Sequence, residues 1–118
     1  MRDEVMGGPP PVDVLANRRR ALRLRRAVLD MTHRAKSSHI GSAFSIAEII
    51  SVLYGDVMRV WPDQPEHPDR DRFVLSKGHA GACLYAMLAD MGFFDRQHLM
   101  TYYMNGSNLS GHVSHKDV

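Results

Sequence analysis

The sequence predicts a mostly helical part of an α/β domain, and three observations support this fold class. Apolar residues recur at three- and four-residue steps over long stretches, which is typical of amphipathic helices. One short apolar run, at residues 73–75, has the aromatic and β-branched character of a buried strand. A single strand leaves its edge groups unpaired, because a sheet requires further strands. We therefore expect the 118 residues to form an incomplete domain, completed by further chain or by another subunit.

The first predicted helix covers residues 15–33 and follows an N-terminal tail. Residues 1–14 contain two glycines and three consecutive prolines. Glycine is costly to order and proline lacks an amide donor, so we expect a flexible tail here and the domain itself at residues 15–118. The helix is predicted to bury an apolar face that two further leucines widen. This face consists of Ala21, Leu24, Val28 and Met31, with Leu22 and Leu29 added.

A short loop at residues 35–44 is expected to lead into a second helix at residues 45–54. Ser45 and Glu48 have the spacing of a capping box, in which each side chain bonds the backbone amide of the other residue. Gly55 suits the end of this helix. The stripe expected to be buried contains Ile46, Ile49, Ile50, Leu53 and Tyr54.

The second half of the chain is predicted to contain a surface loop, the strand and two more helices. Residues 61–72 are rich in proline and charge, which favours an exposed loop before the strand. The third helix is expected at residues 80–91, ended by Gly92. Asp95 is predicted to cap the fourth helix, which ends at Asn105-Gly106.

Composition excludes several classes of function. The net charge of +2 gives no support for nucleic-acid binding, and we interpret the run of arginines at residues 18–26 as a solvated helix face. No apolar stretch approaches the ~20 residues that span a bilayer, and the N-terminus has no signal-peptide core. The single cysteine, Cys83, excludes an intrachain disulfide and is expected to be a buried structural thiol. These features favour a cytoplasmic protein that binds neither membrane nor nucleic acid.

Three histidines occur in glycine-containing turns between predicted elements, at His39, His79 and His112. Loops on a rigid scaffold often carry function, because their side chains face clefts. At Ser76-Lys77-Gly78-His79, a strand is expected to run through a turn into a helix start. That geometry offers amides and the positive end of the helix dipole to an anion, with Lys77 adding charge. This turn is therefore a candidate phosphate site.

Each histidine alone is a weak signal, and other interpretations stay open. A loop histidine is more often solvated or locally bonded than a ligand. Metal binding by the three imidazoles is chemically possible, but the spacings are not those of a helical zinc site and no carboxylate motif accompanies them. We expect no metal ligand among these residues. Ser76 and Cys83 have no base partner that the sequence identifies, so neither is a candidate nucleophile.

Taken together, the three turns and their spacing resemble the beginning of a transketolase. The matching segments are Lys36-Ser-Ser-His-Ile-Gly-Ser, Asp69-Arg-Asp-Arg-Phe-Val-Leu-Ser-Lys-Gly-His-Ala and Asn105-Gly-Ser-Asn-Leu-Ser-Gly-His. They occur in the family's order, and the resemblance extends from about residue 15 to the end. It is nearest to the bacterial forms that are split into N-terminal and C-terminal subunits, and this chain resembles the N-terminal one.

The resemblance implies an α/β fold with a parallel sheet flanked by helices, and it implies thiamine diphosphate as cofactor. The implied reaction moves a two-carbon ketol unit between sugars or sugar phosphates. By resemblance, His79 contacts the cofactor diphosphate, with Lys77 and Gly78 in the same turn. His39 and His112 match histidines at the donor-sugar end of the site, where imidazole can bond hydroxyls and transfer protons.

This chain departs from the family pattern in several places. Most members have proline where this chain has Ile40 and Val113, and arginine where it has Tyr103 and Asn108. Loss of two guanidinium groups removes strong phosphate partners, so the resemblance supports the cofactor more firmly than a sugar-phosphate acceptor. The family's Gly-Asp-Gly motif is absent, so ligands for the cofactor's Mg²⁺ are expected outside this segment. The glutamate that activates the cofactor is absent as well.

Two functions of different classes follow from these observations. In the first, the chain is a component of a transketolase-like enzyme that is inactive alone and works in an oligomer of like or unlike chains, with a C-terminal subunit or further chain. In the second, the chain is a non-catalytic subunit that keeps the family fold and stabilises a partner. The matched turns favour the first, and the lost arginines and short length motivate the second.

Overall fold

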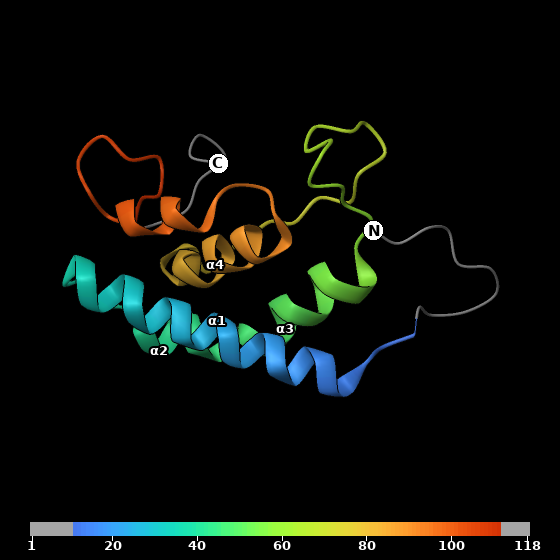
Figure 1. The fold of residues 1–118 in the computed structure, drawn as a ribbon, viewed down its shortest axis with the longest axis horizontal. Coiled ribbons are helices and arrows are strands. Elements are labelled where there is room, and N and C mark those ends of the chain that lie inside the picture. The colour runs from blue at the N-terminus through green and yellow to red at the C-terminus, as the bar shows by residue number, and fades with distance from the viewer. Residues whose placement is uncertain (1–10, 112–118) are drawn as a thin grey trace.

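The computed structural model describes residues 11–111 (Figure 1). Within this range it contains helices and turns but no β-strand. Most of the predicted flexible tail therefore lies outside the described residues. The helical elements are α1 (Val14–Ala35), α2 (Ile40–Ser45), α3 (Ala47–Val52), the π-turn η1 (Leu53–Val57), the 3-10 turn η2 (Gly78–Ala80), α4 (Gly81–Met91) and the 3-10 helix η3 (Arg96–Thr101).

The first helix forms as predicted, but its buried face is narrower than predicted. The Asp13 carboxylate accepts a hydrogen bond from the Ala16 amide at 3.0 Å and caps the N-terminus. The four apolar residues at three- and four-residue steps are buried. Leu22 and Leu29 were predicted to widen this face, but they are 68% and 50% exposed. Each directly follows a buried residue, and a step of one residue turns the helix by about 100°, which carries both leucines to the outer side.

The helix α4 lies at the centre of the fold, where it contacts α1, α2, α3 and η3 (Figure 1). It is apolar on nearly all sides, which is typical of a fully buried helix. As predicted, it ends at Gly92, which has a φ of 95°. Its buried residues are Gly81, Ala82, Cys83, Leu84, Tyr85, Ala86, Met87 and Ala89.

The segment between α1 and the surface loop differs most from the prediction. The helix α2 (Ile40–Ser45) includes residues 40–44, which were expected in a loop. Ser45 is the last residue of α2, so the predicted capping box with Glu48 does not form. The helix also continues past Gly55 as a π-turn. A side chain at Gly55 would collide with the Arg20 guanidinium, so this glycine serves close packing and not termination. Of the predicted stripe, Ile50 and Tyr54 are buried, whereas Ile49 is 59% exposed.

Three of the six arginines at residues 18–26 are solvated, and the other three bind carboxylates of neighbouring elements. Arg23 donates two hydrogen bonds of 3.2 Å to the Asp90 carboxylate of α4, and Arg20 lies 3.8 Å from the same group. Arg96 of η3 also donates to Asp90 at 3.2 Å. Arg25 forms an ion pair of 2.6 Å with Glu48. The prediction of a uniformly solvated face was therefore wrong for these α1 arginines, because carboxylates of neighbouring elements reach them.

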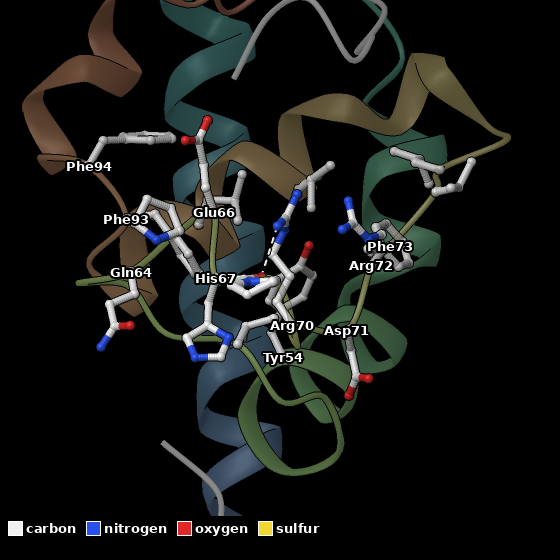
Figure 2. A pocket seen from close by; sticks show the side chains of 17 residues that line it. Tyr54, Gln64, Glu66, His67, Arg70, Asp71, Arg72, Phe73, Phe93 and Phe94 are labelled. Carbon is white, nitrogen blue, oxygen red and sulfur yellow. Dashed lines mark hydrogen bonds between the residues drawn. The ribbon is translucent and has the colours of Figure 1, made fainter.

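An open apolar groove replaces the predicted buried strand. Residues 71–75 have no regular secondary structure and no partner strand within residues 11–111, and Val74 is 83% exposed. The groove lies between the surface loop, whose position was predicted correctly, and α4, and it encloses about 980 Å³. Figure 2 shows Phe93 and Phe94 on one side of it and Phe73 on the other. The strand prediction failed because a strand requires a neighbour that the described residues do not supply.

We expect the isolated chain to associate through this groove, since exposed apolar patches of this kind drive association. Replacing Val74 by Asp should then lower the associated fraction in sedimentation velocity, because a charge at the rim resists burial. Leu22→Ser, an exposed apolar position on α1, is the matched control and should leave association unchanged. A wild-type chain that stays monomeric and unfolds cooperatively would contradict this expectation.

Candidate functional site

Two of the three histidines singled out by the sequence lie side by side. The ring centroids of His39 and His79 are 5.4 Å apart, with the rings edge to face at 65°. His39 directly precedes α2, and His79 is the middle residue of η2, which leads into α4. The elements α2 and η2 pack against each other. The fold therefore brings together two turns that are far apart in the sequence.

The backbone at His39 explains how the first turn reaches this place. The helix α1 ends at Ala35, its C-cap residue Lys36 has a left-handed φ of 53°, and His39 has a φ of 72°. Left-handed conformations cost an L-residue roughly 1–2 kcal/mol, so two of them in four residues mark a tightly determined turn. This turn reverses the chain after α1 and places the His39 ring against η2. Such strain at non-glycine residues is concentrated at functional sites.

A second contact fixes the turn that carries His79. The Lys77 ammonium donates a hydrogen bond of 2.6 Å to the Ser45 hydroxyl, which itself donates to the Ser42 carbonyl at 2.8 Å. The turn is therefore connected to α2 twice, through Lys77 and through His79. Gly78 lies between these residues and begins η2. Sequence reasoning assigned Ser45 to a helix cap and missed this role, because the contact joins residues that are distant in the chain.

His112 lies outside the described residues, but the loop that leads to it is described. The buried Tyr85 of α4 donates a hydrogen bond of 2.9 Å to the Ser110 carbonyl, and the Tyr103 amide donates to the Leu109 carbonyl at 2.8 Å. A side chain at Gly111 would collide with the Tyr103 ring. Tyr85 was not recognised from the sequence, since a tyrosine within an apolar helix gives no sign of a hydrogen-bond partner.

Tyr103 and Asn108, where the resemblance led us to expect arginine, have local structural roles here. The Tyr103 ring stacks on Tyr102 with centroids 5.9 Å apart. The Asn108 side-chain oxygen lies 2.7 Å from His98 Nε2. Both residues therefore shape the loop before His112. Neither carries the positive charge that a guanidinium would bring to an anionic substrate.

The burial of Cys83 argues against a role as a nucleophile. Its side chain is fully buried in α4, and this burial raises the pKa of the thiol to about 12. The prediction of a buried structural thiol is confirmed. Among residues 11–111 there is no group of three histidine, cysteine or acidic side chains placed to hold a metal ion. In the same range, no helix is long and apolar enough to cross a membrane.

We expect Cys83 to resist alkylation in the folded protein. At pH 8 a thiol whose pKa is about 12 is deprotonated roughly three orders of magnitude less often than an ordinary cysteine. The rate of iodoacetamide modification, followed by mass spectrometry, should be at least ~100-fold below that of free cysteine. It should reach the free rate in guanidinium chloride. Modification of the folded chain at the free rate would show that α4 is not packed as described.

Comparison with known proteins shows the family to which the chain belongs. Residues 16–118 match the family described as the thiamine diphosphate binding domain of transketolase. The chain is 44% identical over 88 residues to one subunit of the apulose-4-phosphate transketolase of Phocaeicola vulgatus, covering 75% of this chain and 31% of that protein. It is 39% identical over 89 residues to 6-deoxy-6-sulfo-D-fructose transketolase subunit SqwG of a Clostridium species, covering 75% of this chain and 32% of that protein.

Human transketolase is 44% identical over 92 residues, which cover 78% of this chain and 15% of the human protein. The chain thus spans about a third or less of the length of these relatives. The family match nevertheless includes all three histidine turns that the sequence singled out. The chain therefore belongs to the transketolase family, and its residues 16–118 belong to that family's thiamine diphosphate-binding domain.

Proposed function

We propose that this chain supplies the diphosphate-binding part of an enzyme that transfers a two-carbon ketol unit between sugars. The observation that carries this proposal is the edge-to-face pair of His39 and His79, whose ring centroids are 5.4 Å apart. By resemblance to the family, His39 is expected at the substrate and His79 at the cofactor diphosphate. Ketol transfer requires the cofactor and the donor sugar to be held next to each other, and adjacent residues for the two would achieve this.

The turn at residues 77–79 has the chemistry to hold a diphosphate. It offers an ammonium and an imidazole, both of which donate to phosphate oxygens, and Gly78 adds no side chain that would block approach. The Lys77 ammonium has three donor protons, so the bond to Ser45 leaves it able to bind an anion as well. When bound, thiamine diphosphate supplies the carbon nucleophile and the electron sink, and the protein supplies orientation.

His39 and His112 are proposed to act at the donor sugar. In this role they bond hydroxyl groups and move protons between them, for which an imidazole is suited at neutral pH. The support for His39 is its contact with His79, which places it beside the proposed cofactor turn. The support for His112 is the loop before it, which Tyr85 fixes to α4.

Residues 15–118 are proposed to be the incomplete N-terminal part of the domain. Residues 71–75, which have no regular secondary structure, and the apolar groove beside them are the expected place for neighbouring strands of a parallel sheet. The magnesium ligands and the activating glutamate would then come from further chain or from a C-terminal subunit, in an oligomer in the cytoplasm. The names of two relatives, both of them transketolase subunits, support such a division.

A second candidate is a non-catalytic subunit that stabilises a partner through the same fold. The observation in its favour is that Tyr103 and Asn108 contact Tyr102 and His98 within the loop and bring no positive charge for an anionic substrate. The two candidates differ in cofactor binding by the completed assembly. The enzyme requires it and the structural subunit does not.

Replacing His79 by Ala in the completed enzyme should weaken cofactor binding more than turnover at saturating cofactor. Loss of one hydrogen bond to a charged group costs on the order of 1.5–3 kcal/mol, or about 10- to 150-fold in the dissociation constant. Calorimetric titration with thiamine diphosphate and Mg²⁺ measures this constant. His33→Ala, an exposed histidine in the last turn of α1, is the matched control. An unchanged constant for His79→Ala would remove this residue from the diphosphate site.

Replacing His112 or His39 by Ala should lower ketol transfer while cofactor affinity stays nearly intact. A general acid–base group contributes about 100- to 10,000-fold in rate. The measurement is ketol transfer from a ketose donor by the assembled enzyme, paired with the cofactor titration. Wild-type turnover, or a parallel loss of cofactor and activity, would favour a structural histidine instead.

A further inference from the structure

The outer side of α1 carries a second apolar line that the fold leaves uncovered. Leu15, Leu22 and Leu29 are 57%, 68% and 50% exposed. They are seven residues apart, so each lies two turns from the next on nearly the same side of the helix. The line is about 21 Å long at 1.5 Å per residue. In Figure 1, α1 runs along one edge of the molecule, on the side away from the surface loop.

Positive charge accompanies this line along its length. Arg18, Arg19 and Arg26 occupy the turns between the leucines, and all three are exposed. None of them forms an ion pair with a residue in the 11–111 range, in contrast to Arg23 and Arg25 of the same helix. Arg23 and Arg25 are thus neutralised by Asp90 and Glu48. The charges of Arg18, Arg19 and Arg26 are not neutralised within residues 11–111, so they are available to bind an external group. Asp30 is the only acidic residue in the middle of α1.

We propose that this face of α1, defined by the three leucines and the three arginines, binds an amphipathic helix of a partner protein. The partner helix has an apolar heptad stripe flanked by carboxylates. The leucines repeat every seven residues and so supply one of the two apolar positions per heptad of a seam between helices, and the arginines beside them select the partner by charge. Because Arg18, Arg19 and Arg26 form no ion pair within residues 11–111, acids on the opposite helix would match their charge.

Charge and shape argue against other occupants of the face. A second copy of this chain would place arginines opposite arginines, which is unfavourable. A membrane surface favours a broad apolar face with aromatic residues, whereas this face is a single line of leucines without an aromatic side chain. The inference does not depend on the proposed catalytic function, because none of the six residues belongs to the histidine turns.

The test uses the full chain and two synthetic helical peptides that share a leucine heptad stripe. One carries flanking glutamates and the other carries flanking lysines. Fluorescence anisotropy should show saturable binding of the glutamate peptide, weakened by raising NaCl from about 0.1 M to about 0.5 M. Leu22→Ser should weaken binding about tenfold or more, because one buried leucine is lost. Replacement of the three arginines by glutamate should reverse the preference in favour of the lysine peptide.

Met100→Ser, at a position 47% exposed on η3 and outside this face, is the control and should bind as wild type does. All the substituted side chains are exposed, so unchanged helical circular dichroism is expected for every variant. The proposal is overturned by equal affinity for both peptides or by no binding of either. It is also overturned by a dimer that Leu22→Ser dissociates, or by binding to phosphatidylserine vesicles in preference to the glutamate peptide.

Discussion

The burial of α4 is the constraint on which the rest of the structure depends. This helix contacts α1, α2, α3 and η3, and its first residues are glycine, alanine and cysteine, whose small side chains allow close approach. A helix that is enclosed on nearly all sides has little freedom to move, because protein interiors are close-packed. The turn at its N-terminus is held with it. The position of His79 is therefore a consequence of core packing.

Polar contacts fix the two ends of this core. At the far end of α4, Asp90 binds Arg23 of α1 and Arg96 of η3, with its own side chain only 12% exposed. At the near end, the contacts of Lys77 and His79 connect the turn to α2. The first group closes the helices around α4, and the second brings the His79 ring against the His39 ring. Both groups combine residues that are far apart in the sequence.

The sequence predicted those features that depend on local pattern. The spacing of Ala21, Leu24 and Val28 predicted α1, and Gly92 predicted the end of α4, because helical periodicity and left-handed glycine are local signals. The three glycine turns identified the candidate site. The contact between His39 and His79 could not be predicted from spacing, since it depends on how α2 packs against η2.

The wrong predictions have a common cause in tertiary context. Ser45 and Glu48 have capping-box spacing, but Lys77 and Arg25 bind these side chains instead. Leu22 and Leu29 are apolar, yet they face outward, because the buried face is centred on other residues. Residues 73–75 have strand character without a neighbouring strand in the described range. In these places the local sequence indicates which secondary structure the residues favour. The neighbouring elements then decide which structure and contacts they form.

The central claim is that His39 and His79 belong to one site that faces the cofactor. The most direct measurement is NMR of the assembled enzyme with ¹³C-labelled histidine Cε1 atoms, during titration with thiamine diphosphate and Mg²⁺. The account predicts that the resonances of His39 and His79 shift together with one dissociation constant, while that of His67, which packs against Trp61 in the surface loop, stays in place. A shift of His67 without His39 and His79, or saturation of the two at different cofactor concentrations, would contradict it.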